Sequence, residues 1–406
     1  MRRATHCAHN YPLPLLPSGP GGVGGITSRR TRHTPKSTIA RAYTLDPLSA
    51  PFTPEIHTLD QPSPILATMR RLLPLLLAVS LAAPSAHATD VHVRVDPTLK
   101  TGIEATDAFP TIQMALDHHP FATPNPNGTP GRVFIHIAPG VYRERIIVTQ
   151  NHTNITLLGM GQSPADVLIT NSLNAKTAGG TFFTETAEIN GNGFQADNLT
   201  IENAAGNTGQ AVAAAVRADR VIFKHCRFLG HQDTLFADFG RQYYLDSYIE
   251  GGVDFIFGNA AAVFDHSELH ANGPGFLTAH SRTAPDQPTG FIILNSTVTS
   301  DDLAGKSIGL GRPWRPYARV VFLHTSLPAQ VPPAGWNDWN NPANQATAFF
   351  AEANSTGPGA SPTTRVPWSH QLTPSQTIPF LPHNFLAGPP ASPNHWNPEE
   401  EAAKLP

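Results

Sequence analysis

The chain has 406 residues, a hydrophobic fraction of 40% and 40 prolines, a composition that fits one folded body with irregular flanks. Residues 89–406 carry 18 basic and 27 acidic residues, and this net charge of −9 disfavours binding to nucleic acid or anionic membranes. The two cysteines, Cys7 and Cys226, cannot form a disulfide framework, and we interpret Cys226 as a small core residue of an apolar strand.

The first recognisable element is a secretory signal at residues 69–88. Two arginines follow Met69, an apolar run covers residues 72–83, and a small-x-small cleavage site ends at Ala88. This run is too short to span a bilayer permanently. Residues 1–68 are rich in Pro, Arg, Thr and Ser without a sustained period, so we expect a disordered or mis-assigned upstream extension. The signal predicts a secreted protein, extracellular or periplasmic.

A four-residue pattern then repeats through the middle of the chain. It reads Asn, His or Asp, then a small or apolar residue, any residue, and an apolar residue. Successive copies are 27, 21, 20, 29 and 29 residues apart, and they begin at Asn198, His225, Asp246, His266, Asn295 and His324. Short β-rich stretches with one strong period indicate a solenoid, because a single repeat cannot bury its apolar face alone.

The variable spacing favours a parallel β-helix, whose turns can lengthen without disturbing the stack, over a propeller. We predict an all-β fold, a single-stranded right-handed parallel β-helix over residues 89–387, followed by a flexible tail at 388–406. A short helix over residues 110–117, with Thr111 near its start, is predicted to cap the first coil.

Polar residues interrupt the apolar rhythm of the coils. Gln210 and Gln232 are 22 residues apart, and Asp233 and Asp254 are 21 residues apart, about one coil in each case. Residues one coil apart stand above one another, so these four side chains should share one wall. Arg312 lies 58 residues after Asp254, about two of the longer coils, and can reach the same wall.

This combination of side chains suits ester hydrolysis. Two neighbouring carboxyl groups cannot both ionise freely, so their pKa values separate. A guanidinium favours the ionised form of the carboxylate that it touches, while the other carboxyl keeps its proton and can act as a general acid. Side-chain amides can stabilise an oxyanion, and one such donor is typically worth about 10²–10³ in rate. No Ser-His pair or metal is needed.

The same segments resemble the signature blocks of the pectin methylesterase (pectinesterase) family. Five blocks stand in family order within residues 91–387: GVYRE at 140–144, the Gln210 block, QDTL at 232–235, DFIFG at 254–258 and LGRPW at 310–314. The resemblance implies hydrolysis of the methyl esters of polygalacturonate (pectin) to pectate and methanol, in pectin degradation or cell wall modification. It implies no metal or organic cofactor. We also expect a monomer that, given its net negative charge, binds neither nucleic acid nor, stably, a membrane.

Roles follow from the resemblance residue by residue. Asp254 would be the nucleophile, kept ionised by Arg312. Asp233 would protonate the departing methanol and then activate water. Gln232, with help from Gln210, would hold the oxyanion.

The resemblance also assigns contacts with substrate. Arg312 and Trp314 would pack against galacturonate rings, and Thr186 and Gln210 would contact substrate. Phe257, together with Phe255, would shape the groove.

Structural interpretations of these residues remain open at this point. Asp233 and Asp254 are of a type that is common in turns, Gln210 fits a stacked polar ladder, and Thr186 suits any strand. Glu144 is expected to organise the first coils rather than to touch substrate.

Three other functions also remain open: cleavage of the glycan chain by hydrolysis or by a calcium-dependent lyase, non-catalytic carbohydrate binding, and hydrolysis of another ester or thioester. The attack pattern along the polymer is not predicted.

Overall fold

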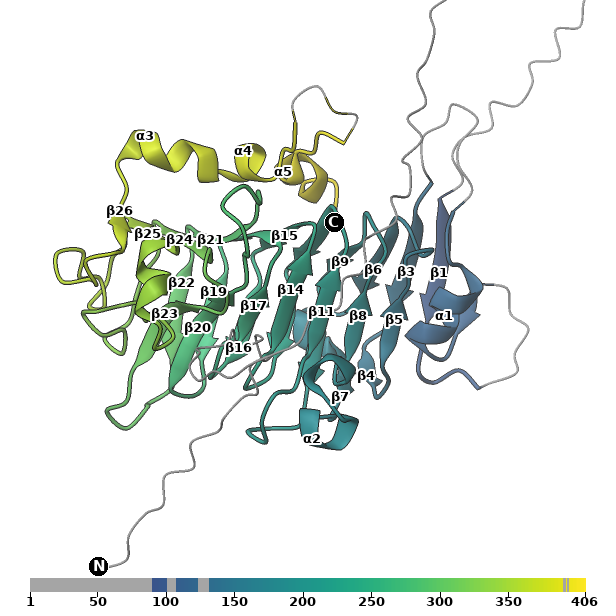
Figure 1. Cartoon of the computed structure of the whole chain (residues 1–406). Coiled ribbons are helices and arrows are strands. Elements are labelled where there is room, and N and C mark those ends of the chain that lie inside the picture. Colours follow the sequence, from purple (N-terminus) through teal and green to yellow (C-terminus); the bar gives the residue numbers. More distant parts are fainter. Residues whose placement is uncertain (1–89, 101–106, 123–130, 390–391, 393) are drawn as a thin grey trace, which may run out of the picture. The chain divides into compact units, whose positions relative to one another are not determined.

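Parallel strands stack coil upon coil in the computed structural model (Figure 1), which describes residues 90–100, 107–122, 131–389, 392 and 394–406. The predicted signal peptide and the upstream extension lie outside the described residues. Each full coil supplies one strand to each of three sheets, here called sheets A, B and C. The chain therefore folds as the predicted right-handed parallel β-helix.

The elements have the following bounds. Sheet A contains, in spatial order, β2 (Ala108–Phe109), β1 (Val91–Val95), β3 (Val133–Ile137), β6 (Ile155–Gly159), β9 (Gln195–Asp197), β12 (Val221–Lys224), β15 (Arg241–Leu245), β18 (Ala261–Asp265), β21 (Gly290–Leu294), β24 (Arg319–Leu323), β25 (Phe349–Ala353) and β26 (His370–Gln371). Sheet B contains β22 (Thr297–Ser300), β19 (Glu268–Ala271), β16 (Tyr248–Gly251), β13 (Arg227–Leu229), β10 (Thr200–Asn203), β7 (Val167–Asn171) and β4 (Gly140–Tyr142). Sheet C contains β23 (Ile308–Pro313), β20 (Gly275–His280), β17 (Ile256–Gly258), β14 (Leu235–Phe239), β11 (Ala214–Arg217), β8 (Ala187–Ile189) and β5 (Ile146–Val148). The helices are α1 (Ile112–His118), α2 (Ala175–Ala178), α3 (Pro374–Thr377), α4 (Pro382–Phe385) and α5 (Pro398–Ala402), with 3₁₀ turns η1 (Pro164–Asp166), η2 (Thr181–Phe183), η3 (Pro342–Ala346) and η4 (Ile378–Phe380).

The repeat found in the sequence is the corner where the chain leaves sheet A for sheet B. The first residue of every copy has a left-handed backbone, with φ between +48° and +55°. Asn, Asp and His adopt this conformation more readily than other residues with a Cβ atom. At Asn198 the side chain also donates hydrogen bonds to the carbonyls of Gly159 and Gly161, at 3.0 and 2.9 Å. Local backbone chemistry therefore sets the period.

The core runs along the inside of the coils. Phe223, Tyr244 and Phe264 occupy the same register on β12, β15 and β18, and their rings stack at centroid distances of 5.3 and 4.6 Å. Fully burying such a side chain stabilises the fold by about 1.5–3 kcal/mol. Cys226 is buried in the same core, and burial raises the pKa of its thiol, as expected of a packing residue.

Helix α1 caps the first coil as predicted. Thr111 is its N-cap and accepts a hydrogen bond from the backbone N–H of Met114. The carboxylate of Glu144 accepts the backbone N–H groups of Ile112 and Gln113, each at 3.0 Å. Glu144 therefore holds the cap against the coils, in agreement with its predicted structural role.

The C-terminal segment covers the outer face of sheet A, where α3, α4 and α5 lie along the strands (Figure 1). Trp396 and Leu405 are buried against this face, and Lys224 on β12 donates a hydrogen bond to the carbonyl of Leu405 at 3.0 Å. The structure therefore differs from the flexible tail predicted for residues 388–406. The burial of these two apolar side chains is the physical reason that residues 394–406 are held. Within the described part of the chain, no helix is both long and apolar enough to cross a membrane.

Candidate active site

The predicted site lies at the corner where the chain passes from sheet B to sheet C. Asp233 stands between β13 and β14, and Asp254 stands between β16 and β17. Their φ angles are +63° and +48°, so both aspartates also occupy left-handed corners. Gln232 pairs with Gln210 on one side and with Val253 on the other. The parallel register therefore places Gln232-Asp233 directly beside Val253-Asp254 on the next coil, as the one-coil spacing predicts.

Arg312 reaches Asp254 from two coils away. It lies on β23 opposite Ala279 of β20. Its Nε donates to Oδ1 of Asp254 at 2.9 Å, and its Nη2 donates to Oδ2 at 2.6 Å. The side chain of Asp254 is 9% exposed and that of Arg312 is 24% exposed, so this two-point ion pair is largely shielded from water.

The two aspartates differ in their electrostatic surroundings. Burial, and then the neighbouring charge of Asp254, raise the pKa of Asp233 well above its usual range, although Arg312 opposes the shift. Burial also raises the pKa of Asp254, but the hydrogen bonds and charge of Arg312 oppose that shift directly. Asp233 is therefore the member of the pair that keeps its proton to higher pH.

The two glutamines stand next to the aspartates at the same corner. The backbone carbonyl of Gln210 accepts the N–H of Ala175, and that of Gln232 accepts the N–H of Ala211, at 2.9 and 3.0 Å. These bonds fix both backbones, and both side chains are half-buried. The two glutamines therefore stand side by side on neighbouring coils, and Gln232 directly precedes Asp233.

Aromatic rings line the outer face of sheet C beside the aspartates. Phe257 on β17 stacks on Phe236 of β14 at 4.6 Å and meets Trp314 at 5.9 Å. The guanidinium of Arg312 lies 3.8 Å from the ring centroid of Trp339 and 4.8 Å from that of Phe276. We call this row of rings the aromatic floor.

The sequence prediction included Phe257 and Trp314 but not the other members of the aromatic floor. Phe236 lies 21 residues before Phe257, the same one-coil interval as the aspartates, and this spacing was the signal that could have found it. Trp339 comes from a loop between β24 and β25, and no pattern in the sequence places it beside Arg312.

Two predicted groove residues lie elsewhere. Thr186 is fully buried, and its hydroxyl donates to the backbone carbonyl of Glu202 at 2.7 Å, so the structure gives it a packing contact instead of a surface for substrate. Phe255 is also fully buried and belongs to the interior core, because it lies at the corner before β17, where the alternation of a regular strand does not apply. Phe257, two residues later, remains on the aromatic floor.

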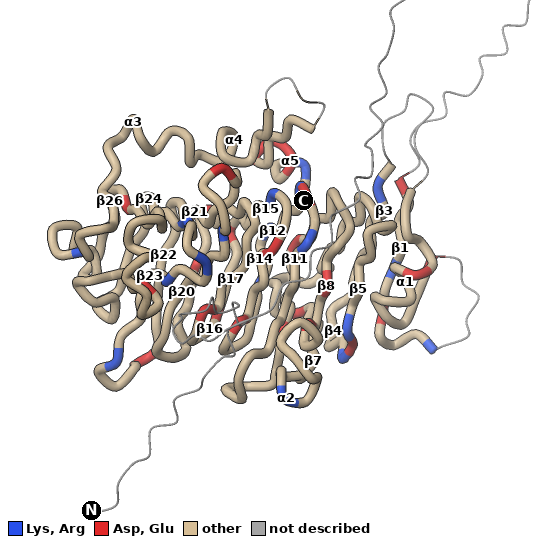
Figure 2. The backbone as a smooth tube through the Cα atoms, in the orientation of Figure 1, with Lys and Arg blue, Asp and Glu red and all other residues tan. Residues whose placement is uncertain are grey.

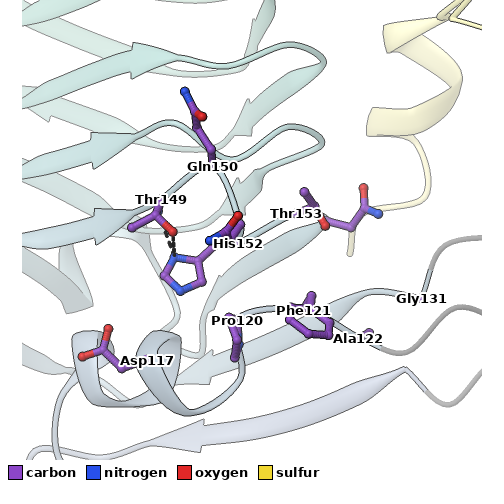
Figure 3. A pocket seen from close by; sticks show the side chains of 11 residues that line it. Asp117, Pro120, Phe121, Ala122, Gly131, Thr149, Gln150, His152 and Thr153 are labelled. Atoms are coloured by element: carbon purple, nitrogen blue, oxygen red, sulfur yellow. Dashed lines mark hydrogen bonds between the residues drawn. The ribbon is translucent and has the colours of Figure 1, made fainter.

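A separate hollow lies at another place. A pocket of about 750 Å³ opens beside α1, lined by residues that include Asp117, Phe121 and His152 (Figure 3). His152 accepts the backbone N–H of Thr149 at 2.8 Å, so its imidazole mainly supports the loop. None of the predicted site residues lines this pocket. Among the described residues, no three His, Cys, Asp or Glu side chains are arranged to hold a metal ion.

Comparison with known proteins relates this geometry to a family. The pectinesterase family model matches residues 101–389. Pectinesterase 31 of Arabidopsis thaliana is 38% identical over 287 residues, which cover 68% of this chain and 88% of that protein. Pectinesterase 1 of Citrus sinensis is 36% identical, and the matched region spans about half (51%) of its length.

Solved structures agree with these matches. Pectin methylesterase from carrot has a TM-score of 0.67 and 32% identity, over 74% of this chain and 95% of that one. A pectin methylesterase in complex with a hexasaccharide has a TM-score of 0.59 and 28% identity, over 77% and 99% of the two chains. The strand register, the carboxyl pair and these matches together show that the chain belongs to the pectinesterase family of carboxylic ester hydrolases.

Proposed function

We propose that this protein hydrolyses the methyl esters of pectin, releasing methanol and leaving free galacturonate carboxylates. Asp254 is the nucleophile, Asp233 is the general acid and base, and Gln232 with Gln210 holds the oxyanion. The observation that carries the proposal is the asymmetry of the carboxyl pair. Arg312 binds both oxygens of Asp254, and the neighbouring Asp233 has the higher pKa.

The first half of the reaction forms an acyl-enzyme. The ionised carboxylate of Asp254 attacks the ester carbonyl carbon, and the carbonyl oxygen becomes an oxyanion that accepts hydrogen bonds from the glutamine amides. The bond to the methoxy oxygen then breaks. The carboxyl proton of Asp233 passes to that oxygen, and methanol leaves.

The second half releases the acid. Asp233, now ionised, takes a proton from water, and the resulting hydroxide attacks the acyl carbon. The bond to Asp254 breaks, so that its carboxylate is restored beside Arg312 and Asp233 is protonated again. Each turnover thus consumes one water and yields one methanol, one carboxylate and one proton.

Several properties of this function also remain proposals. The signal predicted at residues 69–88 supports export of the protein, and the family supports a role in pectin degradation or cell wall modification. We further propose that it acts as a monomer, without a cofactor, nucleic acid or stable membrane association. Trp314 and Phe257 are proposed to pack against the sugar rings.

The test is methanol release from highly methylated pectin by the full chain and by Asp254→Asn. We expect the variant to bind pectin but to lose turnover by about 10³-fold or more, because the amide is a poor nucleophile. Asp246→Asn is the matched control. Asp246 has the same φ of +48° but lies at the corner between sheets A and B, so this change should leave activity intact.

The products separate the competing functions. New reducing ends would indicate cleavage of the glycan chain, and unsaturated ends would indicate a lyase. Unchanged methanol release in Asp254→Asn would exclude the proposed nucleophile. Pectin binding without any product from the unmodified protein would favour a non-catalytic solenoid.

A further inference from the structure

Asn272 follows β19 and links the two coils that carry the aspartates. Its side-chain N–H groups donate to the backbone carbonyl of Gly230 at 2.8 Å and to Oε1 of Glu250 at 2.9 Å. Gly230 lies three residues before Asp233, and Glu250 lies four residues before Asp254. One side-chain amide therefore bonds the coil of Asp233 and the coil of Asp254 at the same time.

The surroundings of this amide fix its orientation. Both partners are oxygen acceptors, so the nitrogen of the Asn272 amide must face them. Its Oδ1 is buried and makes no hydrogen bond to any residue that the structure describes, so the two donated bonds hold the side chain. Glu250 is held as well, because its Oε2 accepts the hydroxyl of Tyr248 at 2.8 Å. Figure 2 shows red acidic segments beside β16, and Asn272 supplies a neutral donor there.

The coils meet at glycines in this corner. A Cβ atom added to Gly251 would collide with the Cβ of Phe255, and one added to Gly275 would collide with the carbonyl oxygen of Gly252. The close packing of the coils therefore requires glycine at both positions. Because glycine has no side chain, the amide of Asn272 supplies a restraint that these glycines cannot.

The segment that begins at Asn272 also reaches Asp254 and Arg312. The backbone N–H of Asn272 donates to the carbonyl of Gly251 at 3.1 Å. Four residues later, the carbonyl of Phe276 accepts the backbone N–H of Asp254 at 2.8 Å. The guanidinium of Arg312 lies 4.8 Å from the centroid of the Phe276 ring. Asn272 therefore anchors a segment that contacts both members of the ion pair.

We propose that Asn272 is a positioning residue, whose amide holds the coil of Asp233 against the coil of Asp254 and so sets the separation of the two carboxyl groups. This inference rests on the proposed function and adds to it a residue outside the five signature blocks. In the proposed reaction Asp254 attacks the ester carbon while Asp233 reaches the methoxy oxygen. A shift of one coil against the other misplaces the acid relative to the nucleophile, and a misplacement of about 1 Å can lower the rate about 10²-fold.

The experiment measures kcat, KM and the pH profile of kcat/KM for methanol release by the full chain, Asn272→Ala and Asn272→Asp. The aspartate has the size of asparagine, but its carboxylate cannot donate and would face two oxygen acceptors. It takes the place of the alanine variant if that variant does not fold. We expect both variants to lose kcat by about 10–100-fold. KM should stay within about twofold, because the aromatic floor is unchanged.

The pH profile should change as well. Burial, and then the charge of Asp254, raise the pKa of Asp233. Looser coils admit water and weaken both effects, so the alkaline limb should move to lower pH in Asn272→Ala. A residue that only stabilised the fold would change the folded fraction and leave the midpoints of both limbs where they are.

Asn198→Ala is the matched control. The amide of Asn198 also donates to two acceptors, the carbonyls of Gly159 and Gly161, but at the corner between sheets A and B. Denaturant melts should show a similar loss of stability, while kcat and both limbs should equal those of the unmodified chain.

Two results would overturn this inference alone: unchanged kcat and limbs in the folded Asn272 variants, or equal changes in Asn198→Ala. If the unmodified chain released no methanol from pectin, the proposed function itself would fail.

Discussion

Arg312 binds Asp254 through two parallel hydrogen bonds, whereas Asp233, one coil earlier, receives none from any guanidinium in the part of the chain that the structure describes. Asp254 is buried and Asp233 is half-buried, and desolvation raises the pKa of both carboxyl groups. Arg312 separates them, because it bonds only one of the pair. The division of labour that we propose between nucleophile and acid would thus depend on one side chain from two coils away.

The first prediction concerns this two-point contact. Arg312→Lys should lower kcat by about 10²-fold, because an ammonium is a point charge and cannot bond both oxygens of Asp254 in one plane. The chain offers a matched control in Arg241, which binds Asp219 in the same way, at 2.8 and 2.6 Å, away from the site. Arg241→Lys should cost stability and leave kcat within about twofold. Equal losses of kcat in the two variants would contradict a special role for Arg312.

The pH dependence of kcat/KM follows from the raised pKa values. The proposed mechanism requires Asp254 ionised and Asp233 protonated, so the rate should rise as the first group loses its proton and fall as the second does. Both limbs should lie above pH 3.8, the ordinary value for Asp, and their midpoints belong to the pair as a whole. In Arg312→Gln the acidic limb should move to higher pH, because the group that lowers the pKa of Asp254 is gone. An acidic limb at an unchanged pH would contradict this prediction.

The ionisable carboxyl group of Asp233 should lower the free energy of unfolding at the pH at which the protein is active. Its folded pKa is above the unfolded value, so the folded state binds the proton more tightly than the unfolded state. This contribution to stability is complete below the unfolded pKa and is lost as pH rises through the folded pKa. Asp233→Asn cannot ionise, so we expect it to melt at a higher temperature than the unmodified chain at pH 8 and at about the same temperature at pH 3. It should also release methanol far more slowly.

Thermal melts at the two pH values check this prediction. Asp246→Asn serves as the control, since that side chain is 46% exposed at a corner of the same backbone conformation. If Asp233→Asn melted no higher than the unmodified chain at pH 8, ionisation of Asp233 would not destabilise the folded state, and the prediction would be wrong.

The period of the fold could be predicted because it has a local cause. The left-handed corners favour Asn, Asp or His, so the repeat is visible in the sequence. Asp233 and Asp254 also occupy left-handed corners, one coil apart. Trp339 and the C-terminal helices could not be predicted in the same way. Trp339 reaches Arg312 from a long irregular loop, and Trp396 packs on sheet A after a Pro-rich segment without periodicity. The positions of Trp339 and Trp396 depend on contacts with segments that are not separated from them by the coil interval.

The local cause of the repeat can itself be tested at Asn198. Its φ is +55°, and its amide donates to the carbonyls of Gly159 and Gly161. Asn198→Ala loses both hydrogen bonds, and alanine adopts a left-handed backbone less readily than asparagine does. We therefore expect a loss of about 2–3 kcal/mol in the free energy of unfolding. Asn198→Gly loses the same bonds but accepts the backbone, so it should be less destabilising than the alanine variant. Denaturant melts measure both, and methanol release by the folded variants should remain normal. If glycine were as destabilising as alanine, the corner would owe its residue preference to the hydrogen bonds alone, and the left-handed backbone would not explain the repeat.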